Sequence, residues 1–342
     1  MANARVTNEP ANYLALGKQA AKDTEATTFY FLKQLSGAGF QVTWNMTEER
    51  EGGDGQEIGL RYKDMIKADG VANGNARYGL AGRLFAWTLG GETVASAAAG
   101  ATSIQNHVAF PVASLPYLTA EQRYADEVER ADNVIITSLD IEGQSGKPLK
   151  MTANFMVGGT VYQRDIASSL TPAREVNRPW FFPYGSYVFD GAASYANKVT
   201  KFKLSIQRHV DDTIQTTGLN KEDVAPLNFD VQLDVTLKYE TRDFYQKVAY
   251  LGGSQVQPDF ATGSFQLNVL TSGAAIPGQY TPGVATGYLM QVNLPLLQYV
   301  DGKANKLEPD GKTMYLDLVL KGIKGATSQV WTSVYTDDIA VY

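Results

Sequence analysis

The residues that most often do chemistry in proteins are scarce in this chain. It has two histidines, His107 and His209, and no cysteine, which excludes a disulfide, a thiolate metal site and a cysteine nucleophile. A site built on both histidines would need the fold to bring them together, and we expect both to be ordinary surface residues. The sequence carries no Gly-x-Ser-x-Gly elbow, phosphate loop, dinucleotide fingerprint or paired-histidine motif. We therefore predict that the protein is not an enzyme and uses neither a metal nor a cofactor.

Two further segments have residue types that could bind a ligand. The stretch from Asp301 to Gly311 spaces its oxygen-bearing residues loosely like a calcium loop, but it lacks the central glycine and the closing acidic residue of such loops. We interpret it as the turn of a hairpin. The aromatic cluster from Pro179 to Tyr187 could stack on a sugar, although packing or a subunit contact is the commoner use of such a cluster. Its aromatic members are Trp180, Phe181, Phe182, Tyr184 and Tyr187.

Two charged segments occupy the same place in the two halves of the chain, between a strand and an apolar segment. We expect long loops over residues 48–75 and 208–226, and loops of this length in compact domains are usually functional or disordered. Their shared position favours a role in interaction over simple solvation. The residues assigned to this contact are Glu48, Glu49, Arg50, Glu51, Asp54, Lys63, Lys67, Asp211, Asp212, Lys221, Glu222 and Asp223.

The elements that must position these residues repeat along the chain. Alternating strands at residues 40–46 and 202–206 open two similar stretches, and each stretch closes with Leu-Gly-Gly, at residues 89–91 and 251–253. Both halves then carry a pair of strands joined by a turn. These pairs are residues 134–139 with 151–159, and residues 288–299 with 314–322. A long internal period of this kind predicts a duplicated structural unit.

A short helix is expected before each Leu-Gly-Gly. Residues 80–89 form the first, with Gly90 as its stop, and residues 242–251 form the second, with Thr241 as its N-cap. The clearest strand of the chain runs from Val231 to Tyr239, where apolar and polar residues alternate strictly. Such a strand has one buried and one wet face.

Composition and charge exclude several classes of protein. The 342 residues include 36 acidic and 30 basic side chains, a formal net charge of −6, so tight binding to a phosphate backbone is not expected. The 44% hydrophobic content with 19 tyrosines and 32 glycines is typical of a β-rich protein. No apolar run approaches membrane-spanning length, and the N-terminus lacks the apolar core of a signal peptide. We expect no membrane partner and synthesis in a cytoplasm.

Taken together, the ordered motifs resemble the major tail tube protein of long-tailed, siphovirus-type bacteriophages. The resemblance begins at Leu16-Gly17-Lys18-Gln19 and continues through Asp23-Thr24 to the segment Thr27–Leu32. It continues with the strand, charged segment, helix and Leu-Gly-Gly of residues 44–91, and with the strand pair at residues 134–139 and 151–159. No single motif is specific, but their order covers most of the chain.

The resemblance implies a mainly β fold: two tandem tail-tube-like β-barrel or sandwich domains, each with a short flanking helix, plus N- and C-terminal arms. The expected boundaries are an arm at residues 1–28, a first domain at 29–165, a linker at 166–198, a second domain at 199–325 and an arm at 326–342. Family members with one domain form hexameric rings, so a chain with two domains implies a trimeric, pseudo-hexameric ring.

For function, the resemblance implies a structural virion protein that assembles in the host cytoplasm and polymerises as stacked rings into a hollow tail tube. DNA passes through it during genome ejection as transient cargo. The partners implied are further copies of the chain and the tape measure, tail tip and tail terminator proteins. The charge balance predicts a net negative lumen that repels phosphate. A carbohydrate-binding β-sandwich or adhesin that uses the aromatic cluster at Trp180 to Tyr187 is the alternative.

Overall fold

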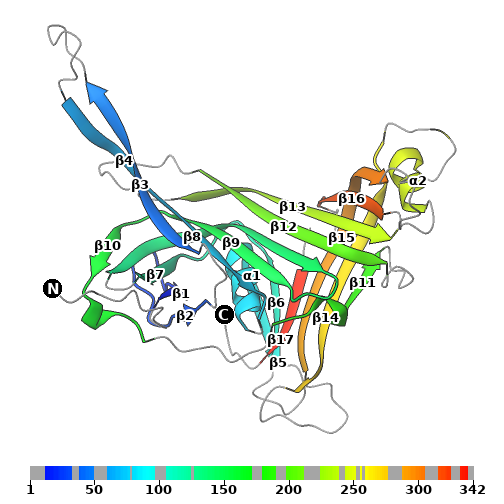
Figure 1. Cartoon of the computed structure of the whole chain (residues 1–342), viewed down its shortest axis with the longest axis horizontal. Coiled ribbons are helices and arrows are strands. Elements are labelled where there is room, and N and C mark those ends of the chain that lie inside the picture. The colour runs from blue at the N-terminus through cyan, green and yellow to red at the C-terminus, as the bar shows by residue number, and fades with distance from the viewer. Residues whose placement is uncertain are drawn as a thin grey trace, which may run out of the picture.

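The computed structural model describes 15 segments of the chain, and it is mainly β (Figure 1). They are residues 12–32, 38–49, 60–77, 79–96, 105–124, 127–171, 179–189, 198–211, 224–238, 243–251, 255, 259–275, 287–304, 315–324 and 332–337.

Eight antiparallel strands lie side by side in one continuous run. Each strand pairs with the next in the following order: β3 (Gly39–Glu49), β4 (Leu60–Asn75), β9 (Lys150–Val157), β8 (Glu127–Gln144), β12 (Val199–Asp211), β13 (Ala225–Lys238), β16 (Tyr315–Gly322) and β15 (Gly287–Ala304). One face of this run packs on the core and the other is polar, because apolar and polar side chains alternate along strands such as β13 and β16.

Further strands extend the sheet around the first halves of β8 and β15. Strands β7 (Leu118–Tyr124) and β10 (Val161–Arg164) flank β8, and β1 (Tyr13–Lys18) lies between β7 and β2 (Tyr30–Phe31). Strands β14 (Thr262–Ala275) and β17 (Thr332–Asp337) flank β15, and β11 (Gly185–Phe189) pairs with β14. The hairpin of β5 (Gly90–Ser96) and β6 (Gln105–Pro111) adds to the edge of β17.

The same hydrogen-bonded framework occurs twice. Strands β1, β3, β4, β7, β8, β9 and β10, which we name the first repeat, correspond to β11, β12, β13, β14, β15, β16 and β17, the second repeat. The bulge between Trp44 and Met46 of β3 matches the bulge between Arg208 and Val210 of β12. Two further pairs of bulges also match: Ile136/Ser138 with Tyr299/Asp301, and Leu118/Ala120 with Gly263/Phe265. The duplication predicted from the sequence is therefore present in the strand registers.

The helices lie where the repeated Leu-Gly-Gly predicted them. Helix α1 (Leu80–Leu89) is buried along its whole length and ends at Gly90, which adopts the left-handed conformation with its N–H bonded to Ala86 O. Helix α2 (Asp243–Tyr250) is followed by Leu251 at a φ of 50°. Two 3₁₀ turns, η1 (Ile166–Ser168) and η2 (Phe182–Tyr184), complete the described helical residues.

The long loop expected over residues 48–75 is wrong, because β4 starts at Leu60 and continues to Asn75. The strand was missed because its core-facing positions carry small residues, Ala68, Gly70 and Ala72, instead of large apolar ones. Small residues are required here because aromatic side chains of the neighbouring strands fill the space. A Cβ at Gly70 would lie 2.2 Å from the Phe155 ring and 2.8 Å from Phe40 Cβ.

The described parts of the two expected arms include strands. Tyr13 to Gly17 are buried in β1, between β2 and β7, so their apolar patch packs on the chain itself. Near the C-terminus, β17 is a strand held between β15 and β6. One contiguous buried cluster extends from Leu14 to Leu320 and includes residues of both repeats. The proposed division into two domains joined at residues 166–198 stays a prediction.

Candidate assembly surfaces

The two repeats meet where β8 pairs with β12, a ladder that we name the seam. Its register runs from Ser138 opposite Gln207 to Gln144 opposite Lys201. On the polar face, Lys203 Nζ lies 2.9 Å from Asp140 and 3.7 Å from Glu142. The hydrogen bond to Asp140 raises the pKa of Lys203 above its usual value. Because the ammonium is partly exposed, this cluster contributes little stability, and its main effect is to neutralise charge on the polar face.

On the core face of the seam, an aromatic ring packs over a glycine. Phe202 lies opposite Gly143, where a Cβ would come within 2.2 Å of the Phe202 ring. Phe182 and Tyr187 stack at 4.9 Å between ring centroids and both pack on Phe202. Only a glycine at this position of β8 leaves room for the three rings. The pairing of β8 with β12 therefore depends on the small size of Gly143 as well as on backbone hydrogen bonds.

Arg208 ties the second repeat to the end of helix α1 in the first. This side chain is 5% exposed, and its Nε donates to Thr88 O at 3.1 Å. Its Nη2 donates to Leu89 O at 2.5 Å and to Val112 O at 2.9 Å. The last carbonyls of a helix have no partner within the helix and carry partial negative charge, so a buried cation suits this position.

Beyond Arg208, the ends of β12 and β13 cover a small apolar cluster. Val210 packs on the group formed by Leu115, Ile135 and Val224. Leu115 lies just before β7 and Ile135 lies in β8, so this contact again joins the second repeat to the first. The seam therefore has three parts: a strand ladder, an arginine on the helix end and an apolar contact.

The two outer edges of the eight-strand run are the counterparts of the strands that form the seam. Within the part of the chain that the structure describes, β3 pairs with β4 alone. At the other end, Gly302 to Ala304 of β15 pair with β16, and no other described strand pairs with them. By the repeat, β3 corresponds to β12, and this part of β15 corresponds to the part of β8 that forms the seam. The chain thus presents at its two ends the edges that it joins in its middle.

A polar network, buried at Glu121 and Arg130, fixes the strands around β8. Tyr13 donates to Glu121 at 2.5 Å, and Arg130 donates to Glu121 at 2.7 Å and to Glu25 at 2.6 Å. Tyr162 also donates to Glu25, and this bond, followed by the charge of Arg130, holds the pKa of Glu25 below its ordinary value. Every carboxylate of the network is held by donors from other strands. The arrangement positions strands and leaves no group poised for proton transfer.

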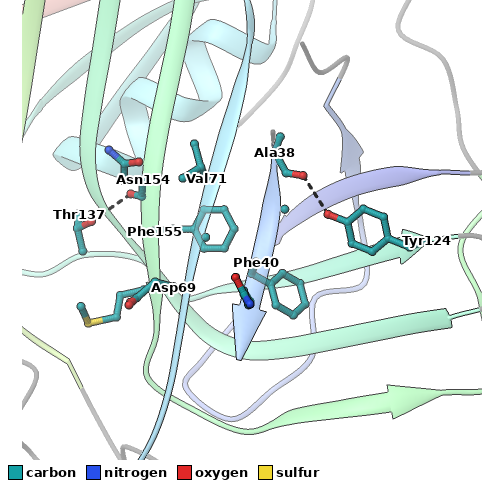
Figure 2. Close-up of a pocket in the computed structure, with 12 residues that line it drawn as sticks. Ala38, Phe40, Asp69, Val71, Tyr124, Thr137, Asn154 and Phe155 are labelled. Atoms are coloured by element: carbon teal, nitrogen blue, oxygen red, sulfur yellow. Dashed lines mark hydrogen bonds between the residues drawn. The ribbon is translucent and has the colours of Figure 1, made fainter. Parts of the chain in front are cut away.

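A groove on the first repeat has a volume of about 650 Å³. Figure 2 shows the rings of Phe40 and Phe155 in its wall, with Tyr124 donating to Ala38 O at 3.0 Å. Asp69 is the single charged side chain among its lining residues. One carboxylate without a base, a nucleophile or a second acid makes no catalytic constellation.

The predicted contact residues are only partly placed. Glu48 forms an ion pair with Arg61 at 3.0 Å across the β3–β4 hairpin, and Lys63 Nζ lies 4.2 Å from the Trp44 ring centroid. Glu49, Lys67 and Asp211 lie on strands β3, β4 and β12. The remaining predicted residues, Arg50, Glu51, Asp54, Asp212, Lys221, Glu222 and Asp223, lie outside the described residues. Their role between rings stays a prediction.

The aromatic cluster and the histidines lie as follows. Trp180, Phe182 and Tyr187 are buried and Phe181 is partly exposed, while Tyr184 belongs to η2. Buried rings offer no face to a sugar, so they lend no support to the carbohydrate-binding alternative. His107 is buried, not on the surface as expected, with Nδ1 2.6 Å from Glu92. His209 lies 2.9 Å from Asp230 on another strand pair, and no metal-binding cluster occurs among the described residues.

Sequence reasoning missed Arg208 and the pairing of Gly143 with Phe202. A signal for the arginine was present, because Phe202, Leu204 and Ile206 alternate toward the core and residue 208 continues that face. The hydrophobic pattern of a strand predicts that such a position is buried whatever residue occupies it.

Comparison with known protein families shows which family the chain belongs to. The family model for "Phage tail tube protein" matches residues 11–296. The chain belongs to the phage tail tube protein family. It is therefore a structural tail tube protein and a component of the bacteriophage virion that self-assembles into the tail, and this family is not known to be enzymatic. No curated protein matches the chain. No helix in the described segments is long and apolar enough to cross a membrane.

Proposed function

We propose that three copies of this tail tube protein close into a pseudo-hexameric ring and that these rings stack into the tube of a long-tailed phage. The observation that carries the proposal is the seam together with the two outer edges of the eight-strand run. A head-to-tail contact that repeats the seam between chains uses different surfaces on the two partners. Such a contact closes into a ring when its rotation is a simple fraction of a turn.

The repeat fixes the register of this contact. In the seam, Gln207 lies opposite Ser138 and Ile206 lies opposite Leu139. Their counterparts place Thr43 of one copy opposite Asp301 of the next, and Val42 opposite Gly302. Three copies of an eight-strand run then give about 24 strands in one closed sheet, which leaves no edge strand exposed.

The polar face of the run is the surface proposed to line the lumen. On it, Asp140 lies beside Lys203, and Asp317 accepts a hydrogen bond from Thr236 of the neighbouring strand at 2.7 Å. A lysine held by carboxylates has little capacity to displace counterions from DNA. Such a wall lets duplex DNA pass without trapping it, and the net negative lumen expected from the composition stays part of the proposal.

Ring stacking is proposed to use the β3–β4 and β12–β13 turns that carry the charged residues named above. The tape measure protein inside the tube, and the tail tip and tail terminator proteins at its ends, are the further partners proposed. The DNA is transient cargo in this scheme, and the protein performs no chemistry on it.

The absence of native cysteines allows a direct test of ring closure. Residues opposite each other on neighbouring antiparallel strands have Cβ atoms about 4.5–5.5 Å apart, close to disulfide reach. The variant Thr43→Cys/Asp301→Cys should give, on oxidation, a covalent ladder that ends at three chains. The matched control Ser138→Cys/Gln207→Cys should cross-link within one chain and give no ladder.

Electron microscopy and native mass measurement of the purified protein complete the test. We expect rings of three chains with apparent sixfold symmetry in projection. Rings of six chains, or a control that cross-links while the test variant does not, would overturn the trimeric head-to-tail ring.

A further inference from the structure

Apolar side chains are exposed at both ends of the eight-strand run. On the β3–β4 hairpin, Trp44 is 49% exposed and Met46 is 62% exposed. At the other end, Phe260, just before β14, is 52% exposed, and Leu251 at the end of α2 is also exposed. Figure 1 shows the hairpin projecting at one end of the molecule and α2 lying at the opposite end. A head-to-tail neighbour would bring these two surfaces together.

The seam shows what each surface does when it is covered. Trp44 and Met46 occupy the positions of Arg208 and Val210, directly before and after the matching bulge. Arg208 lies on the end of helix α1, and Val210 packs on the cluster that contains Leu115. Within one chain, the two positions of this strand therefore cover the helix end and the apolar residue beside it.

The same two targets exist, uncovered, in the second repeat. Helix α2 ends at Tyr250 with Leu251 after it, as α1 ends at Leu89 with Gly90 after it. Phe260 precedes Gly263, the first bulge residue of β14, by three positions, and Leu115 precedes Leu118 of β7 by the same three. Leu115 is buried by the covering strands, whereas Phe260 is half exposed. The difference in burial follows from whether a hairpin lies on top.

We propose that Trp44 and Met46 of one copy pack on Phe260 and Leu251 of the next, as an aromatic anchor for the contact between chains. This inference rests on the proposed head-to-tail ring and names the side chains that stabilise it. Trp44 and Met46 differ in type from Arg208 and Val210, which hold the same positions in the seam, and the difference has a physical reason. An arginine whose withdrawal removes buried hydrogen bonds from three carbonyls suits a permanent contact within a chain. An aromatic and a thioether tolerate exposure before assembly and are favoured in the desolvated centre of an interface.

The Trp44 ring is already held in place before assembly, because Lys63 Nζ lies over it at 4.2 Å from the centroid. A contact residue with a fixed ring loses little conformational freedom when the neighbour arrives.

The test is a double-mutant cycle on ring formation. We would measure the dissociation constant of the ring by mass photometry for the wild type, Trp44→Ala, Phe260→Ala and the double variant. Each single variant should weaken ring formation by about 30-fold or more, the loss typical of an interface anchor. The double variant should be little worse than either single one, because both changes remove the same contact. Leu227→Ala, which removes an equally exposed apolar side chain on β13 with no counterpart in the seam, should have no effect.

Two outcomes separate the inference from the ring proposal. If Thr43→Cys/Asp301→Cys forms the three-chain ladder but Trp44→Ala assembles like the wild type, or if the two changes are additive, the anchor is wrong and the ring stands. If Thr43→Cys/Asp301→Cys forms no ladder while the control Ser138→Cys/Gln207→Cys cross-links within its chain, the ring itself is wrong. Far-ultraviolet circular dichroism of each variant shows that a loss of rings is not a loss of folding.

Discussion

Replacing Arg208 by methionine should destabilise the folded chain far more than the removal of an exposed charge from the same eight-strand run. Methionine keeps much of the side-chain volume but removes every donor. The carbonyl oxygens of Thr88, Leu89 and Val112 would each lose their bond from Arg208, and Leu89 O would keep its bond from Val112 N. An unsatisfied buried polar group costs the folded state the hydration that the unfolded state regains.

The size of the effect follows from two opposing terms. Three hydrogen bonds from a charged donor contribute about 2 kcal/mol each, or roughly 6 kcal/mol together. Burial opposes them, because it lowers the pKa of Arg208 from its ordinary value to about 10, which corresponds to a desolvation cost of about 3 kcal/mol. The expected loss in the free energy of unfolding is therefore about 3 kcal/mol.

The measurement is urea unfolding followed by far-ultraviolet circular dichroism. Agreement between transitions at two protein concentrations ensures that assembly does not contribute. The matched control is Arg61→Met, which removes an exposed arginine whose partner is Glu48 at 3.0 Å. This control should lose less than about 1 kcal/mol. If both variants lost the same amount, the reasoning that Arg208 joins the repeats through buried hydrogen bonds would be refuted.

Three further predictions address the seam, the polar network and ring stacking. Gly143→Ala should lower the free energy of unfolding by about 1–3 kcal/mol through overpacking against Phe202, and an unchanged urea midpoint would contradict the size argument. The lowered pKa of Glu25 means that its stabilisation is present above its unfolded pKa and is lost as pH falls through the lower folded value. Tyr162→Phe should therefore shift the acid loss of thermal stability to higher pH, and identical pH profiles for variant and wild type would show that this bond does not set the pKa. Replacing residues 50–59 by a two-residue turn should leave single rings intact and abolish tubes in electron micrographs, whereas normal tubes would discard the stacking role of that turn.

Where the sequence pattern was strong, it located elements accurately. Helix α1 has the predicted bounds because a run of helix formers ends at a glycine that can take the left-handed conformation. Strand β13 was clear because its apolar residues alternate at the period of a half-buried strand. Repetition of these local signals also indicated the duplication, since two copies of one fold need similar strands, helix stops and turns in the same order.

Strands β1, β4 and β17 were missed because their signals are not local. Strand β4 carries glycine and alanine toward the core, where Phe40 and Phe155 of its neighbours supply the volume. His107 was expected on the surface, but it is buried on β6, the strand between β5 and β17. In each case the environment comes from strands far away in the chain, which a single-sequence pattern does not contain.

The sequence by itself determined that the chain is β-rich, duplicated, poor in catalytic residues and similar to a tail tube family, because composition, period and motif order are properties of the chain alone. Only the tertiary structure decided which edges meet. Backbone hydrogen bonds between strands are the same for every residue type, so the sequence does not name a strand's partner. The tertiary structure determines the partner of each strand. Strand β8 pairs with β12 inside the chain, and the equivalent edges of β15 and β3 remain at the two ends. The proposed ring depends on these two edges.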